Sequence, residues 1–220
     1  YYSPGACSLA AHALLREWGV PFEARPVAFA KGEHLSPDYL SLNPHGRVPL
    51  LLIDGKPVSE LSGILTWIGQ QSGFYPDPGT YEAGKTGEWL GWLTSTVHID
   101  FALIWRGERF AADKSVHAAL RQKGYDLVGE HFAEIEAALQ RNRFAVGGAR
   151  TVADYNLLPF YRWGNRIGLN MAAHYPAWSA HADSLSERAA VRETLAAEGI
   201  SIHDAQPLPE GVIAPAPPRL

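Results

Sequence analysis

The chain has 220 residues, 46% of them apolar, and a formal net charge of −4 at pH 7. Its apolar content suffices for a packed core and excludes a disordered chain, and its net charge gives no sign of a nucleic-acid or anionic-membrane partner. One cysteine excludes an intramolecular disulfide, and no apolar run reaches the roughly 18 residues of a membrane span. We find no basic-then-apolar leader and expect a cytoplasmic protein.

The N-terminal stretch combines a turn, the cysteine and a helix. Pro4 and Gly5 predict the turn, and apolar residues recur at helical spacing over residues 9–18. Cys7 lies where this helix begins, and there unpaired N–H groups and the positive end of the helix dipole favour a thiolate. We therefore expect its pKa to lie below the free-thiol value of about 8.5. The alternative is a small buried residue without chemistry.

The segments that follow predict a small α/β unit. Residues 22–29 alternate loosely and predict a strand, and Ser36-Pro37-Asp38 predicts the start of a short helix. Residues 50–59 predict a hairpin around an Asp-Gly turn. A helix is predicted over residues 60–71, with apolar side chains on one face. This order of elements predicts helices packed on a mixed sheet.

A stretch rich in Gly and Pro, residues 72–80, predicts a linker, and the pattern after it is helical. Thr151 and Asp154 have the spacing of a capping box, with Asp in place of Glu. We expect this motif to start a buried helix and assign it no chemistry. The predicted helices cover residues 81–110, 115–142 and 151–167, with two more beginning near 176 and 187, and a proline-rich extended tail from 205.

Two short motifs flank the predicted hairpin. A cis Val48-Pro49 peptide would turn the Val48 N–H and C=O toward a ligand, whereas most X–Pro bonds are trans. Ser59-Glu60 precedes a helix whose first N–H groups could bind a carboxylate, while the Glu60 side chain could hold an ammonium. Because Ser and Glu are also common as plain helix caps, both interpretations remain open.

The helix predicted over residues 81–110 has two unlike faces. One is apolar and predicts a core contact. The other carries small residues, a hydroxyl and an imidazole rather than charges: Gly91, Ser95, His98, Ala102 and Trp105. Such a face predicts contact with the other domain or with a ligand. For His98 the alternative is a hydrogen-bonded histidine at a domain interface.

Together these features resemble a cytosolic glutathione transferase, most of all the bacterial beta class. The resemblance spans the whole chain and rests on residues 2–8 (YSPGACS), 43–49 (NPHGRVP), 58–64 (VSELSGI), His98 and residues 151–154. It implies an α+β fold, with a thioredoxin-like, glutathione-binding N-terminal domain and an all-helical C-terminal domain. These domains would cover residues 1–74 and 82–220. It also implies a cis Val48-Pro49 bond and a homodimer.

The resemblance also assigns roles residue by residue. Cys7 and His98 would approach the sulfur of glutathione, and Tyr2 is a further catalytic candidate. The Val48 backbone would pair with the cysteinyl part, and Glu60 with the following N–H would hold the γ-glutamyl end. The implied glutathione-binding residues are Arg47, Val48, Pro49, Glu60, Leu61, Ser95 and Lys31.

The implied function is conjugation of the glutathione thiolate, as co-substrate, to a small hydrophobic electrophile, without a metal. One alternative keeps glutathione but makes the reaction thiol–disulfide exchange through Cys7. Another is a binding protein that uses the fold without turnover. Two departures from the family pattern give that last alternative weight: Leu61 replaces the usual Ser or Gly, and Gly91 the usual Asn. A further departure is Ile99, which stands where a basic residue is frequent.

Overall fold

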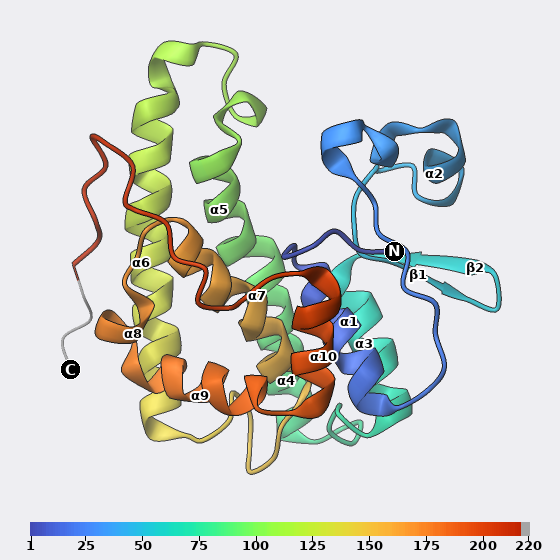
Figure 1. The fold of residues 1–220 in the computed structure, drawn as a ribbon. Helices are drawn as coiled ribbons and strands as arrows, with labels where there is room; N and C mark the ends of the chain where they lie inside the picture. The colour runs from blue at the N-terminus through green and yellow to red at the C-terminus, as the bar shows by residue number, and fades with distance from the viewer. Residues whose placement is uncertain (217–220) are drawn as a thin grey trace.

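In the computed structural model, which describes residues 1–216, an α/β unit is followed by a helical unit (Figure 1). The first unit contains α1 (Ser8–Trp18), α2 (Pro37–Leu42), β1 (Leu50–Ile53), β2 (Lys56–Ser59) and α3 (Leu61–Ser72). The second contains α4 (Tyr81–Trp92), α5 (His98–Trp105), α6 (His117–Arg141), α7 (Val152–Arg166), α8 (Met171–His174), α9 (Pro176–Ser186) and α10 (Ala189–Glu198). Short 3₁₀ turns cover Phe29–Lys31, Glu33–Leu35, Gly107–Arg109 and Lys114–Val116.

The sheet is built around the predicted hairpin. Strands β1 and β2 pair antiparallel, from Leu50 opposite Ser59 to Ile53 opposite Lys56. On the other side of β1, the Tyr1 ammonium donates to the Leu50 carbonyl at 2.8 Å, and the Leu50 N–H donates to the Tyr1 carbonyl at 3.2 Å. The N-terminal residues therefore extend the hairpin as an antiparallel neighbour.

The strand expected over residues 22–29 is reduced to one parallel bridge, between Tyr2 and Pro26. Tyr2 donates to the Arg25 carbonyl at 3.0 Å and accepts from the Val27 N–H at 2.8 Å. Neither bond uses the nitrogen of Pro26; the partner segment turns away directly after Tyr2, where the Ala6 N–H donates to the Ser3 carbonyl at 3.0 Å. The predicted mixed sheet is therefore reduced to the antiparallel β1–β2 pair with one parallel bridge beside it.

Helix α1 is the element that joins the two units. It packs against α3 on one side and against α7 and α10 on the other. Leu9, Ala10, Ala13 and Leu14 are all fully buried, because apolar side chains cover both of these faces. The turn that carries Cys7 therefore lies where the two units meet.

The segment predicted as one helix over residues 81–110 ends earlier and contains a wider turn. Residues Leu93–Val97 form a π-helical turn between α4 and α5, and the helix ends at Trp105. The Thr94 and Ser95 hydroxyls donate to the Leu90 and Gly91 carbonyls at 2.6 and 2.8 Å. These bonds satisfy carbonyls that a widened turn displaces.

The capping box at the start of α7 is confirmed, and its role is structural. The Thr151 N–H donates to the Asp154 carboxylate at 2.7 Å, and the Ala153 N–H donates to the Thr151 hydroxyl at 3.2 Å. Asp154 also meets His181 Nε2 at 2.8 Å. Each of residues 152–165 is buried, so α7 is the central helix of its unit.

The tail lies along the helical unit without forming a helix or strand up to residue 216 (Figure 1). The Gln206 N–H donates to the Asn165 carbonyl at 3.0 Å, and the Ile213 N–H donates to Gln122 Oε1 at 2.9 Å. The remaining part of the expected extended tail and C-terminal domain, residues 217–220, lies outside the described residues. Among residues 1–216 no helix has both the length and the apolar character needed to cross a bilayer.

Candidate functional site

A cleft between the two units contains most of the residues singled out from the sequence. It has two lobes, and six residues line both of them: Cys7, Arg47, Val48, His98, Ala102 and Arg109. The α3 lobe, of about 290 Å³, extends from these residues to Ser59, Glu60 and Leu61. The α7 lobe, of about 560 Å³, extends to Trp105, Trp163 and Arg166.

Seven of the ten predicted site residues line this cleft: Cys7, Arg47, Val48, Pro49, Glu60, Leu61 and His98. The Val48-Pro49 peptide is cis, as the resemblance implies. Both lobes include Val48, so its backbone lies at the point where they join. The sequence motifs before and after the hairpin thus converge on one cavity with the cysteine.

The other three predicted residues lie elsewhere. The Tyr2 ring packs on His12 with centroids 4.8 Å apart and lines a separate cavity. Lys31 is exposed at the end of a 3₁₀ turn, outside both lobes. Ser95 is also exposed and outside the lobes, because after the π-helical turn it is Thr94 that shares the cleft face with His98.

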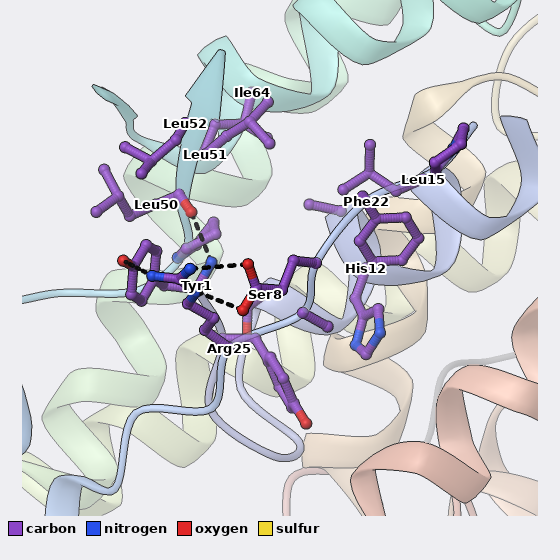
Figure 2. Close-up of a pocket in the computed structure, with 16 residues that line it drawn as sticks. Tyr1, Ser8, His12, Leu15, Phe22, Arg25, Leu50, Leu51, Leu52 and Ile64 are labelled. Atoms are coloured by element: carbon purple, nitrogen blue, oxygen red, sulfur yellow. Dashed lines mark hydrogen bonds and ion pairs between the residues drawn. The ribbon is translucent and has the colours of Figure 1, made fainter. Parts of the chain in front are cut away.

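Figure 2 shows the separate cavity that Tyr2 helps to line. It measures about 300 Å³ and is bounded by residues 21–25, α1 and β1. His12, Leu15 and Phe22 lie along one side of it, and Leu50, Leu51 and Leu52 along another. Neither Cys7 nor His98 lines it, so we assign it no part in the chemistry of the cleft.

A hydrogen-bonded loop presents Val48 to the cleft. The Arg47 carbonyl accepts from Asn43 Nδ2 and from the Tyr39 hydroxyl, both at 2.7 Å. Gly46 has φ +58°, and a Cβ there would come 2.9 Å from the His34 carbonyl oxygen. Glycine is therefore required at this position for steric and for backbone reasons.

The start of α3 offers donors and an acceptor to a ligand in the α3 lobe. Glu60 precedes the helix with φ +68°, and its carboxylate is exposed. The first N–H groups of a helix have no intrahelical partner, and the Leu61 N–H is the first of α3. The Leu61 side chain is buried in the core, so only its backbone faces the cleft region.

Burial decides the protonation state of Cys7. Its side chain is buried at the start of α1, and Sγ lies 3.7 Å from the Val48 carbonyl oxygen, to which the thiol donates. Loss of solvent raises the pKa of Cys7 to about 12, although the backbone N–H groups of Cys7 and Ser8 act in the opposite direction. The expectation of a lowered pKa is therefore wrong: desolvation of the anion outweighs the helix terminus.

His98 is neutral at physiological pH. Its ring is edge-on to Trp163 with centroids 5.0 Å apart, and it is enclosed between the units. Burial, together with the positive charges of Arg47, Arg106 and Arg109, lowers the pKa of His98 to about 4. His98 can therefore donate or accept a hydrogen bond in the cleft but does not supply the positive charge considered from the sequence.

The turn before Cys7 is held by the helical unit. The Gly5 N–H donates to Glu198 Oε2 at 2.8 Å, and the Gly5 carbonyl accepts from Trp163 Nε1 at 2.8 Å. The other carboxylate oxygen of Glu198 lies 2.8 Å from His12 Nδ1. The N–H and the carbonyl of Gly5 are thus both held by residues more than 150 positions away in the chain.

Sequence reasoning missed several residues of the cleft. Arg106 and Arg109 follow α5 and reach Arg47 only through the packing of the two units. Thr94 replaces Ser95 because of a π-helical turn, which no spacing rule announces. The overlooked lining residues include His34, Asn43, Thr94, Arg106, Arg109, Phe110, Trp163 and Arg166.

Comparison with known proteins identifies the family. Residues 1–70 match the model of the glutathione S-transferase N-terminal domain, and residues 98–189 match that of the glutathione S-transferase C-terminal domain. Glutathione S-transferase GstA of Escherichia coli O157:H7 is 30% identical over 210 residues, covering 91% of this chain and 98% of the relative. The chain belongs to the glutathione S-transferase family.

Solved transferase structures share the architecture. A sphingomonad glutathione S-transferase complexed with glutathione is 34% identical, with a TM-score of 0.79 and coverage of 91% of this chain and 98% of that one. A beta class glutathione S-transferase of Sphingomonas chungbukensis is 30% identical, with a TM-score of 0.80 and the same coverage. The chain therefore has the transferase fold, a thioredoxin-like N-terminal domain followed by a helical C-terminal domain.

Proposed function

We propose that this transferase binds glutathione in the cleft and conjugates its thiolate to an electrophile. The observation that carries the proposal is the arrangement of the α3 lobe. The N-terminus of α3 and the Glu60 carboxylate line the part of this lobe that lies away from the other lobe, and Cys7, Val48 and His98 line the part that both lobes share. This arrangement matches a ligand with an amino acid terminus, a peptide group and a thiol.

The two parts of the lobe suit the two ends of such a ligand. The γ-glutamyl carboxylate would accept from the first N–H groups of α3, and its ammonium would pair with Glu60. The cysteinyl part would bond to the Val48 backbone. Its sulfur would then lie near Cys7 and His98, both of which line the lobe.

Activation of the sulfur would come from neutral donors and from nearby arginines. Because Cys7 stays protonated and His98 neutral, each has one proton to donate, and neither carries the negative charge itself. The Cys7 thiol would exchange its bond to the Val48 carbonyl for one to the glutathione thiolate. The guanidinium of Arg47 lines the same lobe and favours the anion through its charge. Orientation of the thiolate toward a bound electrophile supplies the rest of the rate gain.

The protonated state of Cys7 argues against thiol–disulfide exchange at this residue. Thiol–disulfide exchange needs the thiolate of the attacking cysteine, and burial keeps Cys7 protonated. We therefore place the reacting sulfur on glutathione rather than on the protein. One assay distinguishes an enzyme from a binding protein without turnover. The enzyme converts an activated aryl halide in a reaction that depends on glutathione, whereas the binding protein does not.

Calorimetry tests the binding mode. Glu60→Ala should weaken glutathione by about 1–3 kcal/mol, because it leaves the ligand's ammonium without a partner. The matched control is Glu130→Ala, which removes an exposed carboxylate from α6, outside the cleft. Equal affinity of the Glu60 variant and the parent protein would remove Glu60 from the site, and absence of glutathione binding by the parent protein would refute the proposed function.

We also propose that the enzyme is a cytoplasmic homodimer, with domains that divide at residues 72–80. The support is its membership of the family, in which two-fold pairing is usual. Sedimentation equilibrium should give about twice the chain mass of 24.1 kDa. A monomer at micromolar concentration would contradict this proposal.

A further inference from the structure

The α7 lobe is lined by positive charge without acidic side chains. Arg47 comes from the loop before β1, Arg106 and Arg109 from the segment after α5, and Arg166 from the end of α7. Within residues 1–216, none of these four side chains makes a salt bridge or a side-chain hydrogen bond, and no Asp or Glu lines the lobe. The chain as a whole is negative, with a net charge of −4, so this concentration of arginine is local.

The arginines are close enough to influence one another. Burial lowers the pKa of Arg109, and the neighbouring charges of Arg106 and Arg47 lower it further. The fifth arginine of the lobe, Arg162, is already paired with Asp204 at 3.3 Å. The cluster of Arg47, Arg106, Arg109 and Arg166 is exposed, and Glu108 and Asp204 bring negative charge near Arg109 and Arg166, respectively. An anion bound within this cluster would be attracted by all four charges.

An aromatic surface lies beside this cluster. The rings of Trp105 and Trp163 pack with centroids 5.4 Å apart, and both line the lobe. Trp105 is 45% exposed, so part of its ring is open to a ligand. A planar group that stacks on an indole could direct a carboxylate to a guanidinium, which binds carboxylates through paired N–H donors.

We propose that the electrophile of this enzyme is an aromatic carboxylate, stacked on the exposed part of the Trp105 ring with its anionic group on the arginine cluster. This deepens the proposed function, on which it rests, and narrows the small hydrophobic electrophile implied by the resemblance to an anionic one. Glutathione accounts for part of the positive charge only. Arg47 and Arg109 line both lobes and would face glutathione as well, whereas Arg106 and Arg166 line the α7 lobe alone and remain for the second substrate.

A matched pair of electrophiles tests the proposal. The anionic one is 4-chloro-3,5-dinitrobenzoate, and the neutral one is its methyl ester. In both, the glutathione thiolate forms a C–S bond at the carbon that carries chlorine, the C–Cl bond breaks with its electron pair, and chloride leaves. The thiol proton goes to solvent. The measured quantity is kcat/KM divided by the uncatalysed rate constant of each compound.

The parent enzyme should prefer the carboxylate to the ester by about tenfold or more, and 0.5 M NaCl should reduce this preference, since salt screens partly exposed charges. Arg106→Gln and Arg166→Gln should each lower the preference by about tenfold. The control is Arg141→Gln, an exposed arginine at the end of α6, which should leave it unchanged. A preference for the ester, or one that neither cleft variant alters, would overturn the proposal.

A binding experiment separates this proposal from the proposed function. Quenching of tryptophan fluorescence is titrated with 3,5-dinitrobenzoate and with its methyl ester, neither of which carries a leaving group. Turnover of the ester without preference for the carboxylate would refute the anionic substrate alone. If neither electrophile is converted, the proposed conjugation is refuted. The anion site is then supported only by binding: 3,5-dinitrobenzoate must bind more tightly than its ester, and Arg106→Gln must remove this difference in affinity.

Discussion

Replacement of Glu198 by Ala should destabilise the fold through the turn that carries Cys7. The Glu198 carboxylate is fully buried at the end of α10. It accepts from the Gly5 N–H at 2.8 Å and meets His12 Nδ1 at 2.8 Å. Alanine removes both carboxylate oxygens at once. The Gly5 N–H and His12 Nδ1 are then left without these hydrogen-bond partners.

The magnitude follows from the number of groups left unpaired. Each buried polar group without a partner costs about 1–3 kcal/mol, so the two together cost about 2–6 kcal/mol. This is a large part of the roughly 5–15 kcal/mol that stabilises a typical protein. Glu198→Gln should cost less, because its amide oxygen can still accept from the Gly5 N–H.

The control lies on the same helix. Glu193 is 3.7 Å from Arg16, and its side chain is 65% exposed, so Glu193→Ala should change stability by less than about 1 kcal/mol. Urea denaturation measures the midpoints of all three variants and checks that the m value is constant. A Glu198→Ala variant within about 0.5 kcal/mol of the parent protein, by the same extrapolation, would refute the argument from buried unpaired groups.

Three further predictions concern the cleft. Alkylation of Cys7, the chain's one cysteine, by iodoacetamide should stay slow at neutral pH because burial raises its pKa to about 12; a midpoint near the free-thiol value of about 8.5 would contradict this. The pKa of His98, about 4 in the folded state, lies below its ordinary 6.5. As pH falls, the unfolded state therefore binds a proton at this histidine first, and stability should fall as pH drops from 6.5 toward 4. His98→Asn should make the urea midpoint depend less steeply on pH across this range, and an unchanged dependence would contradict the prediction. Gly5→Ala should destabilise by about 2–4 kcal/mol, because φ is positive and the new Cβ would collide with the Arg162 guanidinium, which the Ser201 carbonyl and Asp204 hold in place. Gly19→Ala, with positive φ but no atom within 4 Å, is its control and should cost about 1 kcal/mol in the same urea assay.

Local patterns in the sequence determined the elements and the residue types of the site. Helical spacing predicted α1, the Asp-Gly turn predicted the β1–β2 hairpin, and Thr151 with Asp154 predicted the start of α7. Each of these depends on residues a few positions apart, whose geometry follows from backbone hydrogen bonding. The strand expected over residues 22–29 is reduced to one bridge because its partner segment turns away after Tyr2, at the Pro4-Gly5 turn that the sequence itself predicted.

Tertiary structure decided the chemistry of these residues. The N-terminus of α1 alone favours a Cys7 thiolate, but packing under the helical unit removes water and raises the pKa. Arg47, Arg106 and Arg166 form one charged surface only because two separately encoded units meet along the cleft. Burial and clustering of charge depend on segments far apart in the chain, and spacing along the sequence carries no information about the solvent or the charges that such packing brings to a residue.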